Sequence, residues 1–290
     1  LRLRLRLPQA GAPLGTGSGV CAAGLGAGVA VNQWVEIPGS TMSTVPASMS
    51  VPNGIVGGQA RMDAWNGYAL AGRRVLSVAQ GGHGDYYGNE VIAFDVDTAR
   101  WSIVKASSPP SVVTISGSRY ADGSPSSTHG YYSWQYIPQR NWVLEAGSTA
   151  HSVDGGTNGD CAVYDITTNA YLAQGTVPNM LPPIGAEYGV AADPATGNVY
   201  VCINYKVDRW NQASNTWTNN FANAPKNAGY ESVLMVDTTR GRMLILGGQG
   251  AMVQPYLLTF ASGNMQTVSV SGDTGIAGPG GQFGQAYCPV

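Results

Sequence analysis

Charged side chains are scarce in this chain of 290 residues, of which they make up 11%, whereas soluble proteins average about 25%. The formal net charge at pH 7 is −2. Proteins that bind nucleic acid need a basic surface to displace counterions from the phosphates, so the composition argues against a nucleic-acid partner. Long apolar runs are also missing: no stretch of about 18 apolar residues occurs, and we expect no membrane-spanning helix.

Cysteine and histidine are few. The four cysteines are Cys21, Cys161, Cys202 and Cys288. None of them forms a CxxC pair, so the spacing indicates neither a zinc site nor a thioredoxin-type site, and both disulfides and buried free thiols stay open. No GxSxG, HExxH or P-loop motif occurs, so hydrolase or nucleotide chemistry has no motif to support it.

Glycine, by contrast, is abundant, with 40 residues in the chain, about twice its usual frequency. Hydrophobic residues make up 43% of the sequence, which excludes a disordered chain, because disorder requires low hydrophobicity and high net charge. A glycine-rich, weakly charged chain with many Tyr and Trp residues is typical of short strands joined by tight turns.

Internal repetition is the strongest pattern. Four apolar segments, at 65–72, 131–138, 188–194 and 231–237, each precede a longer unit. Those units span 75–104, 142–172, 199–218 and 242–268. Each combined repeat contains four predicted strands, here called a to d in chain order, with a short turn between a and b. Repeats of about 45–70 residues with four strands each predict a β-propeller, because a single blade cannot bury both of its faces.

Aromatic residues recur at fixed spacing within these units. They are seven residues apart in three pairs, namely Phe94 and Trp101, Tyr164 and Tyr171, and Trp210 and Trp217. In the last unit Phe260 follows Gly248 by the same interval at which Phe94 follows Gly82. We therefore expect these pairs to mark strands c and d of each blade.

The segments Gly81-Gly82 and Gly247-Gly248, the strand NEVIAFD with Trp101, and the stretch 120–138 resemble the kelch repeat, and more closely the galactose oxidase-like bacterial branch of kelch propellers. The resemblance covers about residues 31–290. It implies an all-β kelch-type β-propeller with four recognisable blades plus a composite or truncated fifth blade. Galactose oxidases bind copper through two tyrosines and two histidines, including one adjacent Tyr-His pair. This sequence has no Tyr-His dipeptide, so no copper ligand transfers.

The ends of the chain predict how the ring closes. Residues 284–290 resemble strand a of a further blade, residues 32–39 resemble strand d, and residues 1–7 and 20–31 supply strands b and c. That arrangement closes a five-bladed ring, whereas a longer parent chain would give six or seven blades. We assign residues 1–30 to an N-terminal extension, either closing strands or a secretory leader, and residues 31–290 to the propeller domain. The leader-like pattern favours an extracellular, periplasmic or surface-exposed location.

In a propeller the b–c and d–a connections emerge on one face, and the opposite face carries short turns poor in aromatics. All three histidines map to the first face. The candidate ligand-binding residues there are His83, Asp85, Tyr86, Tyr87, Tyr120, Asp122, His129, His151, Glu187, Tyr188 and Tyr230. Two interpretations stay open: solvated tight turns that bond the backbone, or a binding site made of clustered aromatic and polar side chains. We expect no cofactor, although His83 and His129 are candidate ligands for a metal ion.

Three functions from different classes follow. The leading hypothesis is a non-catalytic extracytoplasmic propeller that binds a glycan or a protein through its b–c and d–a loops, since low charge favours a polar, neutral ligand. The second is a galactose oxidase-like, metal-dependent oxidoreductase. The third is a structural surface or virion assembly subunit that self-associates through residues 1–30.

Overall fold

The computed structural model describes residues 40–42, 45, 66–81, 86–114, 117–131, 133–147, 159–180, 188–203, 206–223, 232–246 and 255–269, together with two short strands at 4–6 and 34–36. These residues form four antiparallel sheets of four strands each, in which the strand order follows the chain. The fold is therefore an all-β propeller, as the repeats predict. No helix in the described ranges is long and apolar enough to cross a membrane.

Each sheet is one blade of the propeller. Blade 1 contains β3 (Ala69–Ala71), β4 (Arg74–Val78), β5 (Val91–Asp95) and β6 (Arg100–Lys105). Blade 2 contains β7 (Trp134–Ile137), β8 (Trp142–Glu145), β9 (Val163–Asp165) and β10 (Ala170–Tyr171). Blade 3 contains β11 (Gly189–Ala192), β12 (Val199–Ile203), β13 (Lys206–Asn211) and β14 (Thr216–Asn223). Blade 4 contains β15 (Val233–Asp237), β16 (Arg242–Leu246), β17 (Tyr256–Thr259) and β18 (Met265–Thr267).

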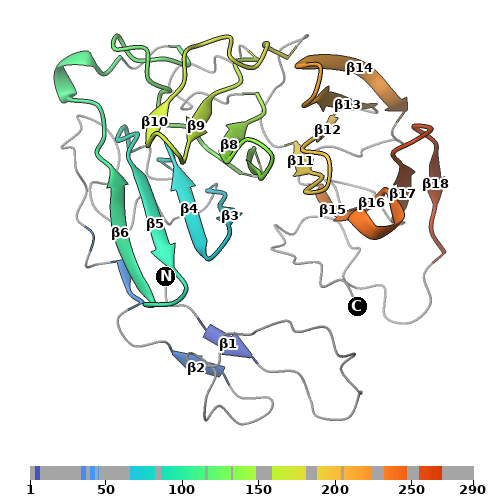
Figure 1. Cartoon of the computed structure of the whole chain (residues 1–290), viewed down its shortest axis with the longest axis horizontal. Coiled ribbons are helices and arrows are strands. Elements are labelled where there is room, and N and C mark those ends of the chain that lie inside the picture. The colour runs from blue at the N-terminus through green and yellow to red at the C-terminus, as the bar shows by residue number, and fades with distance from the viewer. Residues whose placement is uncertain are drawn as a thin grey trace.

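The blades follow one another along an arc, from β3–β6 to β15–β18 (Figure 1). Their first strands contact each other in succession, β3 with β7, β7 with β11, and β11 with β15. Strand a of each blade is thus the inner strand, and strand d is the outer one. Two short 3-10 helices, η4 (Pro110–Val112) and η5 (Thr238–Arg240), lie in the connections.

The spaced aromatics pair across the c–d hairpins. Phe94 lies opposite Trp101 in the ladder, with ring centroids 5.1 Å apart. The same register joins Tyr164 to Tyr171 and Trp210 to Trp217, which confirms the predicted strands. In blades 1 to 3 the hairpin turn is held at its start by an Asp or Asn side chain that accepts bonds from backbone N–H groups two and three residues on, as Asp95 does from Asp97 and Thr98.

Blade 4 departs from one predicted correspondence. There Leu258 lies opposite Met265, seven residues apart, so Leu258 occupies the place of Phe94. Phe260, which the glycine spacing matched to Phe94, instead stacks on Tyr200 of blade 3 with ring centroids 4.4 Å apart. The match was wrong because the connection from β16 to β17 is shorter than that from β4 to β5, so spacing from the glycines does not carry over.

Alternating residues of each strand face opposite neighbours, which is how the blades bury both faces. In β12, Val199 and Val201 pack between blades 2 and 3, whereas Tyr200 and Cys202 pack between blades 3 and 4. The remaining face of blade 1, at Ile92, Phe94 and Trp101, contacts Met42 and Val45. Burying apolar area in this way contributes about 25 cal/mol per Å2, so the core is a series of layers between sheets.

The N-terminal strands pair differently from the predicted order. β1 (Arg4–Arg6) pairs directly with β2 (Trp34–Glu36) in an antiparallel ladder, whereas the composite blade placed residues 20–31 between them. An alternating strand can pair with any compatible edge, so its pattern alone does not choose its neighbour. The strand order predicted for the composite blade is therefore wrong. Residues 20–31 and 284–290 lie outside the described residues, so a fifth blade of another order stays a prediction.

Candidate ligand-binding site on the loop face

The b–c and d–a connections emerge on one side of the propeller, which we call the loop face; the a–b and c–d turns form the opposite turn face. Six of the predicted site residues are described, and all six lie on loop-face connections: Tyr86, Tyr87, Tyr120, Asp122, His129 and Tyr188. His83, Asp85, His151, Glu187 and Tyr230 lie outside the described residues. Asp122 is exposed, and the other five are buried.

The buried tyrosines tie the loops together. The Tyr86 hydroxyl donates to the Glu90 carboxylate at 2.9 Å. The Tyr120 hydroxyl donates to the Tyr87 carbonyl at 2.6 Å and accepts from the Ser127 N–H at 3.0 Å. Burial raises the pKa of Tyr120 above its usual value. The bond from Tyr120 to Tyr87 connects the d–a loop that leads into blade 2 to the b–c loop of blade 1, as does a bond from the Ser127 hydroxyl to the Tyr86 carbonyl at 2.7 Å.

Backbone bonds between the same two loops add to this link. The Gly81 N–H donates to the Thr128 carbonyl at 3.0 Å, and the Thr128 N–H donates to the Ala79 carbonyl at 2.9 Å. A Cβ atom on Gly130 would collide with the Gln80 side chain, so a larger residue there would displace that side chain. The loops are therefore held in one conformation before any ligand arrives.

A buried ion pair anchors the d–a loop to blade 2. Arg119 Nε donates to Asp160 Oδ2 at 2.7 Å, and the two side chains are 9% and 1% exposed. A charge in such a position has to be paired, because removing it from water is costly. The pair joins the loop at residues 117–130 to the start of β9.

A second buried carboxyl lies beside this pair. Glu145, at the end of β8, is fully buried, and its Oε1 accepts from the Thr128 hydroxyl at 2.9 Å. Its Oε2 has no hydrogen-bond partner among the described residues. Burial raises the pKa of Glu145 to about 8, and the nearby Asp160 carboxylate acts in the same direction. Glu145 is therefore largely protonated at neutral pH.

His129 follows Thr128 in the same loop and is buried, with its ring edge-on to Tyr131 at 6.3 Å between centroids. The described residues contain no group of three or more His, Cys, Asp or Glu side chains that could hold a metal ion. His83, the other candidate ligand, lies outside them, so the metal site stays a prediction. Tyr188 is buried in the next junction, where its hydroxyl donates to the Gly147 carbonyl.

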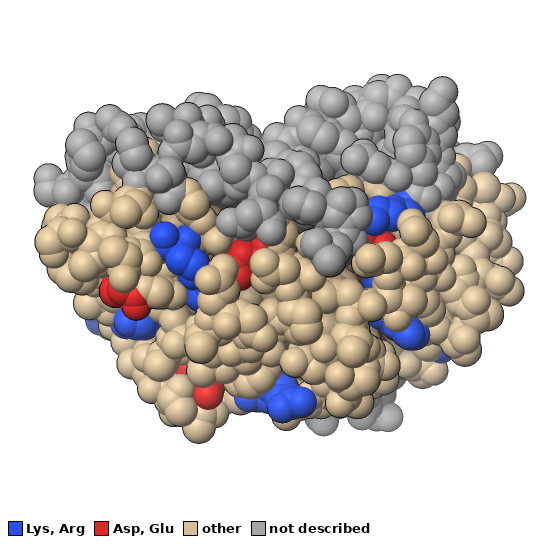
Figure 2. All heavy atoms as spheres, turned by 90° about the horizontal axis from the view of Figure 1, so that it is seen from above, with Lys and Arg blue, Asp and Glu red and all other residues tan. Residues whose placement is uncertain are grey.

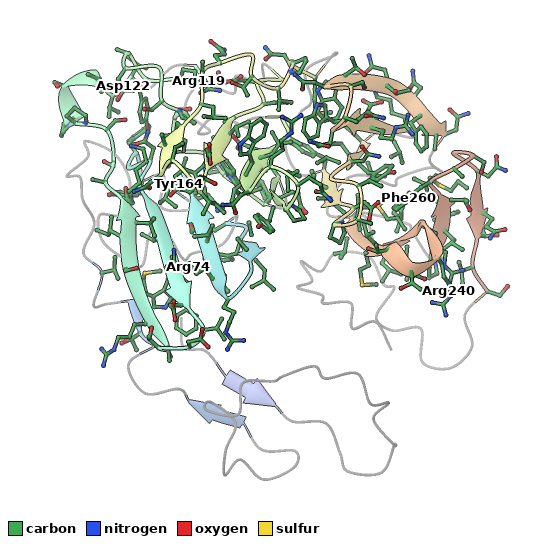
Figure 3. The ribbon with its side chains drawn as sticks, in the orientation of Figure 1. Arg74, Arg119, Asp122, Tyr164, Arg240 and Phe260 are labelled. Carbon is green, nitrogen blue, oxygen red and sulfur yellow. The ribbon has the colours of Figure 1, made fainter. Side chains whose placement is uncertain are left out.

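Beside these anchored loops lies an open groove of about 520 Å3. One wall is the loop at 119–124, which carries Tyr120 and Asp122, and the other is residues 171–174 at the end of β10. Arg119 and Asp122 both lie near β10 at this end of blade 2 (Figure 3). Ligand sites commonly have volumes of about 300–1,000 Å3, so the groove, which we call the loop-face groove, is large enough for a ligand.

Sequence reasoning missed Arg119, Thr128 and Glu145, and it did not predict that Asp160 pairs with Arg119. One signal was present: Glu145 ends the apolar strand WVLE, and a charged residue in such a strand has to be neutralised or paired. The partners of these residues come from distant positions, such as Arg119 and Asp160, 41 residues apart, so no local pattern connects them.

Two of the four cysteines are described, and both Cys161 and Cys202 are buried free thiols. Burial raises the pKa of each to about 12, so neither is a thiolate at neutral pH and neither is reactive. Cys21 and Cys288 lie outside the described residues.

Comparison with known proteins gives no family. No protein-family model matches the chain, and no curated protein matches it. Among solved structures, it resembles a chain in the crystal structure of a nidogen/laminin complex, with a TM-score of 0.44 and 11% sequence identity. The matched region covers 70% of this chain and 63% of that chain. The association between nidogen and laminin is a property of that complex.

Proposed function

We propose that this protein is a non-catalytic binding module that holds an extended segment of another protein in the loop-face groove. The observation that carries the proposal is the groove itself, which lies against loops already fixed by buried hydrogen bonds and by the Arg119–Asp160 pair. A surface that is ordered in advance loses little conformational entropy on binding, so more of the contact energy appears as affinity.

The edge of blade 2 favours a protein segment over other ligands. β10 is the outer strand of its sheet, and residues 171–174, where it ends, form one wall of the groove. An edge strand presents backbone N–H and C=O groups to which an extended segment can hydrogen-bond, as in strand addition. A glycan is the other ligand expected from the low charge. It has no repeating row of amide N–H and C=O groups and cannot extend the sheet as an added strand.

The surface charge agrees with a polar ligand of low charge. Basic and acidic side chains appear as small patches, some of them side by side, among other residues on the side seen in Figure 2. In the groove itself the Arg119 charge is paired with Asp160, and Asp122 is exposed. Asp122 has a pKa below its usual value; although partial desolvation opposes this, bonds from Ser124 and Ser108 stabilise its carboxylate.

The test uses a peptide library displayed on phage and selected against the wild-type protein. Ala173→Trp fills the groove from an exposed position, and Ala195→Trp places the same bulk on an exposed turn of blade 3. We expect selected peptides to bind Ala173→Trp at least about tenfold more weakly than wild type, a loss of about 1.4 kcal/mol, and to bind Ala195→Trp normally.

Peptides that bind both variants equally would show that the groove is not the site. A glycan array probed with the same proteins provides the second arm. If no peptide is selected and glycan binding is lost in Ala173→Trp, the ligand of the groove is a glycan and not a protein segment. The location outside the cytoplasm stays a prediction.

A further inference from the structure

A second cavity, of about 460 Å3, lies at the other end of the junction between blades 1 and 2, on the turn face. Its lining is mixed: Leu76, Val104 and Ile166 are apolar, and Tyr136 and Tyr164 line it from blade 2. The charged and amide side chains in the lining are Arg73, Arg74, Asp95, Asp97 and Asn141. The turns around the pocket are poor in aromatic residues, as expected. Its two tyrosines come from strands, Tyr136 from β7 and Tyr164 from β9. We call this cavity the turn-face pocket.

The pocket exists because one turn is short. In blade 1 only Gly72 and Arg73 separate β3 from β4, whereas residues 138–141 separate β7 from β8 in blade 2. The longer turn reaches across to blade 3, where Gln139 Nε2 donates to the Pro194 carbonyl at 2.8 Å. Among the described residues, no hydrogen bond joins the 72–73 turn to the 138–141 turn, and the space between blades 1 and 2 is left open.

Two adjacent arginines at the pocket differ in how they are paired. Arg73 Nε donates to Asp97 Oδ1 at 2.6 Å, so its charge is neutralised. Arg74 Nε lies 3.9 Å from Asp95 Oδ2, too far for a hydrogen bond, and its side chain is 56% exposed. Within the described part of the chain, the Arg74 guanidinium makes no hydrogen bond, so its N–H donors are available to a ligand.

Arg74 is also close enough to the pocket wall to act on it electrostatically. Burial raises the pKa of Tyr164 to about 12, and the positive charge of Arg74 opposes that rise. Arg74 and Tyr164 are both labelled at the blade 1–blade 2 junction in Figure 3, at a distance from Arg119 and Asp122 at the loop-face end. The pocket thus combines a few apolar side chains with a guanidinium whose donors are not used.

We propose that the turn-face pocket is a second binding site, for a protein segment in which a carboxylate adjoins an apolar side chain. The apolar side chain lies against Val104 and Ile166, which are half-buried in the lining, and the carboxylate accepts hydrogen bonds from the planar N–H donors of Arg74. Charge-assisted bonds from arginine to carboxylate are roughly twice as strong as neutral ones, and a bidentate pair fixes orientation. Because Asp95 and Asp97 border the pocket, it accepts one negative charge and disfavours a multiply charged anion.

The site is separate from the loop-face groove, so a result at one does not decide the other. The probes are 3-phenylpropionate, its uncharged analogue 3-phenylpropanamide, and inorganic phosphate. Binding is followed by NMR titration of the protein labelled with 15N at arginine and 13C at the tyrosine rings. We expect 3-phenylpropionate to shift the Arg74 Nε–H and Tyr164 ring signals, and the amide to bind at least about tenfold more weakly.

Three variants complete the test. Arg74→Gln removes the charge at a half-exposed position and is expected to abolish the preference for the carboxylate. Arg74→Lys keeps the charge without the planar fork and is expected to weaken binding. Arg100→Gln removes an exposed arginine from the same blade that does not line the pocket and is expected to leave binding unchanged.

Equal affinities for the carboxylate and the amide would overturn the proposal, as would unaltered carboxylate binding in Arg74→Gln. Phosphate that binds as tightly as 3-phenylpropionate would overturn the assignment to a single carboxylate. Spectra of the variants that match the wild type away from the pocket show that the fold is intact, so each outcome reports on the pocket alone.

Discussion

The junction between blades 1 and 2 and the junction between blades 3 and 4 solve the same packing problem with different chemistry. Between blades 3 and 4 the hydrophobic cluster includes Met243, Ile245 and Leu258 together with the stacked rings of Tyr200 and Phe260. A polar contact lies at the turn face of this junction, where the Thr238 hydroxyl donates to the Asp193 carboxylate at 3.4 Å. Between blades 1 and 2 an apolar cluster is continued at the loop-face end by Glu145 and the Arg119–Asp160 pair. Apolar side chains can pack against several neighbours in several orientations. A hydrogen bond or an ion pair, by contrast, requires one particular partner at a defined distance and angle.

The two junctions therefore contribute differently to stability and to the conformation of the loops. Replacing a buried ion pair by apolar residues of similar volume is often neutral or stabilising, so such a pair is weak evidence for stability. Here the polar groups connect the loop at residues 117–130 to blade 2, and part of that loop forms a wall of the loop-face groove. We infer that the apolar junction stabilises the propeller and the polar junction shapes its surface.

The largest expected effect comes from removing one residue of the buried Arg119–Asp160 ion pair. Asp160→Ala leaves the Arg119 guanidinium buried without its counter-charge, and we expect the free energy of unfolding to fall by about 3–5 kcal/mol. Chemical denaturation measures it. The double variant Arg119→Met with Asp160→Leu removes both charges and should regain most of the loss. If the double variant is as unstable as Asp160→Ala, the cost does not come from an unpaired charge.

A smaller effect, dependent on pH, is expected at Glu145. Its pKa is raised in the folded protein to about 8 from 4.5, so between these values the folded state binds more protons than the unfolded state. The contribution of Glu145 to stability is therefore fully present below pH 4.5 and is lost as the pH rises toward 8, the reverse of a salt-bridged carboxylate. Glu145→Gln cannot ionise, and should flatten this slope and raise stability at pH 8 by about 1–3 kcal/mol.

Denaturation of wild type and Glu145→Gln at several pH values between 4.5 and 9 provides the measurement. Asp97→Asn, which changes an exposed carboxylate, is the control and should keep the wild-type slope. Identical slopes in wild type and Glu145→Gln would mean that Glu145 ionises normally in the folded protein.

The smallest effect sharpens the comparison between a buried and an exposed ion pair. Asp97→Ala removes the partner of Arg73, where the two side chains are 58% and 46% exposed. Water solvates the remaining arginine, so we expect no measurable change in Tm. A loss comparable to that of Asp160→Ala would show that burial is not what distinguishes the two pairs.

The sequence predicts the blades well because their signals are local. Aromatics seven residues apart, such as Phe94 and Trp101, lie opposite each other in a hairpin, and the hairpin geometry fixes that interval. The loop face follows from topology alone, which is why Tyr86, Tyr120 and Tyr188 were placed on it correctly. Their burial was not predicted, because it depends on a second loop arriving from far along the chain, as Ser127 does at Tyr120.

The turn-face pocket was also beyond sequence reasoning. Its cause is a difference in turn length between blades 1 and 2, and its consequence depends on whether a side chain such as Gln139 spans the gap. A periodic pattern describes what the repeats share, whereas both candidate sites arise where one repeat differs from the next.

Amide hydrogen exchange tests the central claim, a loop face held rigid by buried bonds, most directly. The amides of Gly81, Ser126 and Thr128 lie in loops but donate to buried carbonyls of the junction between blades 1 and 2. We expect them to exchange as slowly as amides of β5 and β12, and far more slowly than those of the exposed Asp97–Thr98 turn. Exchange of these three amides at the rate of that exposed turn would contradict the account.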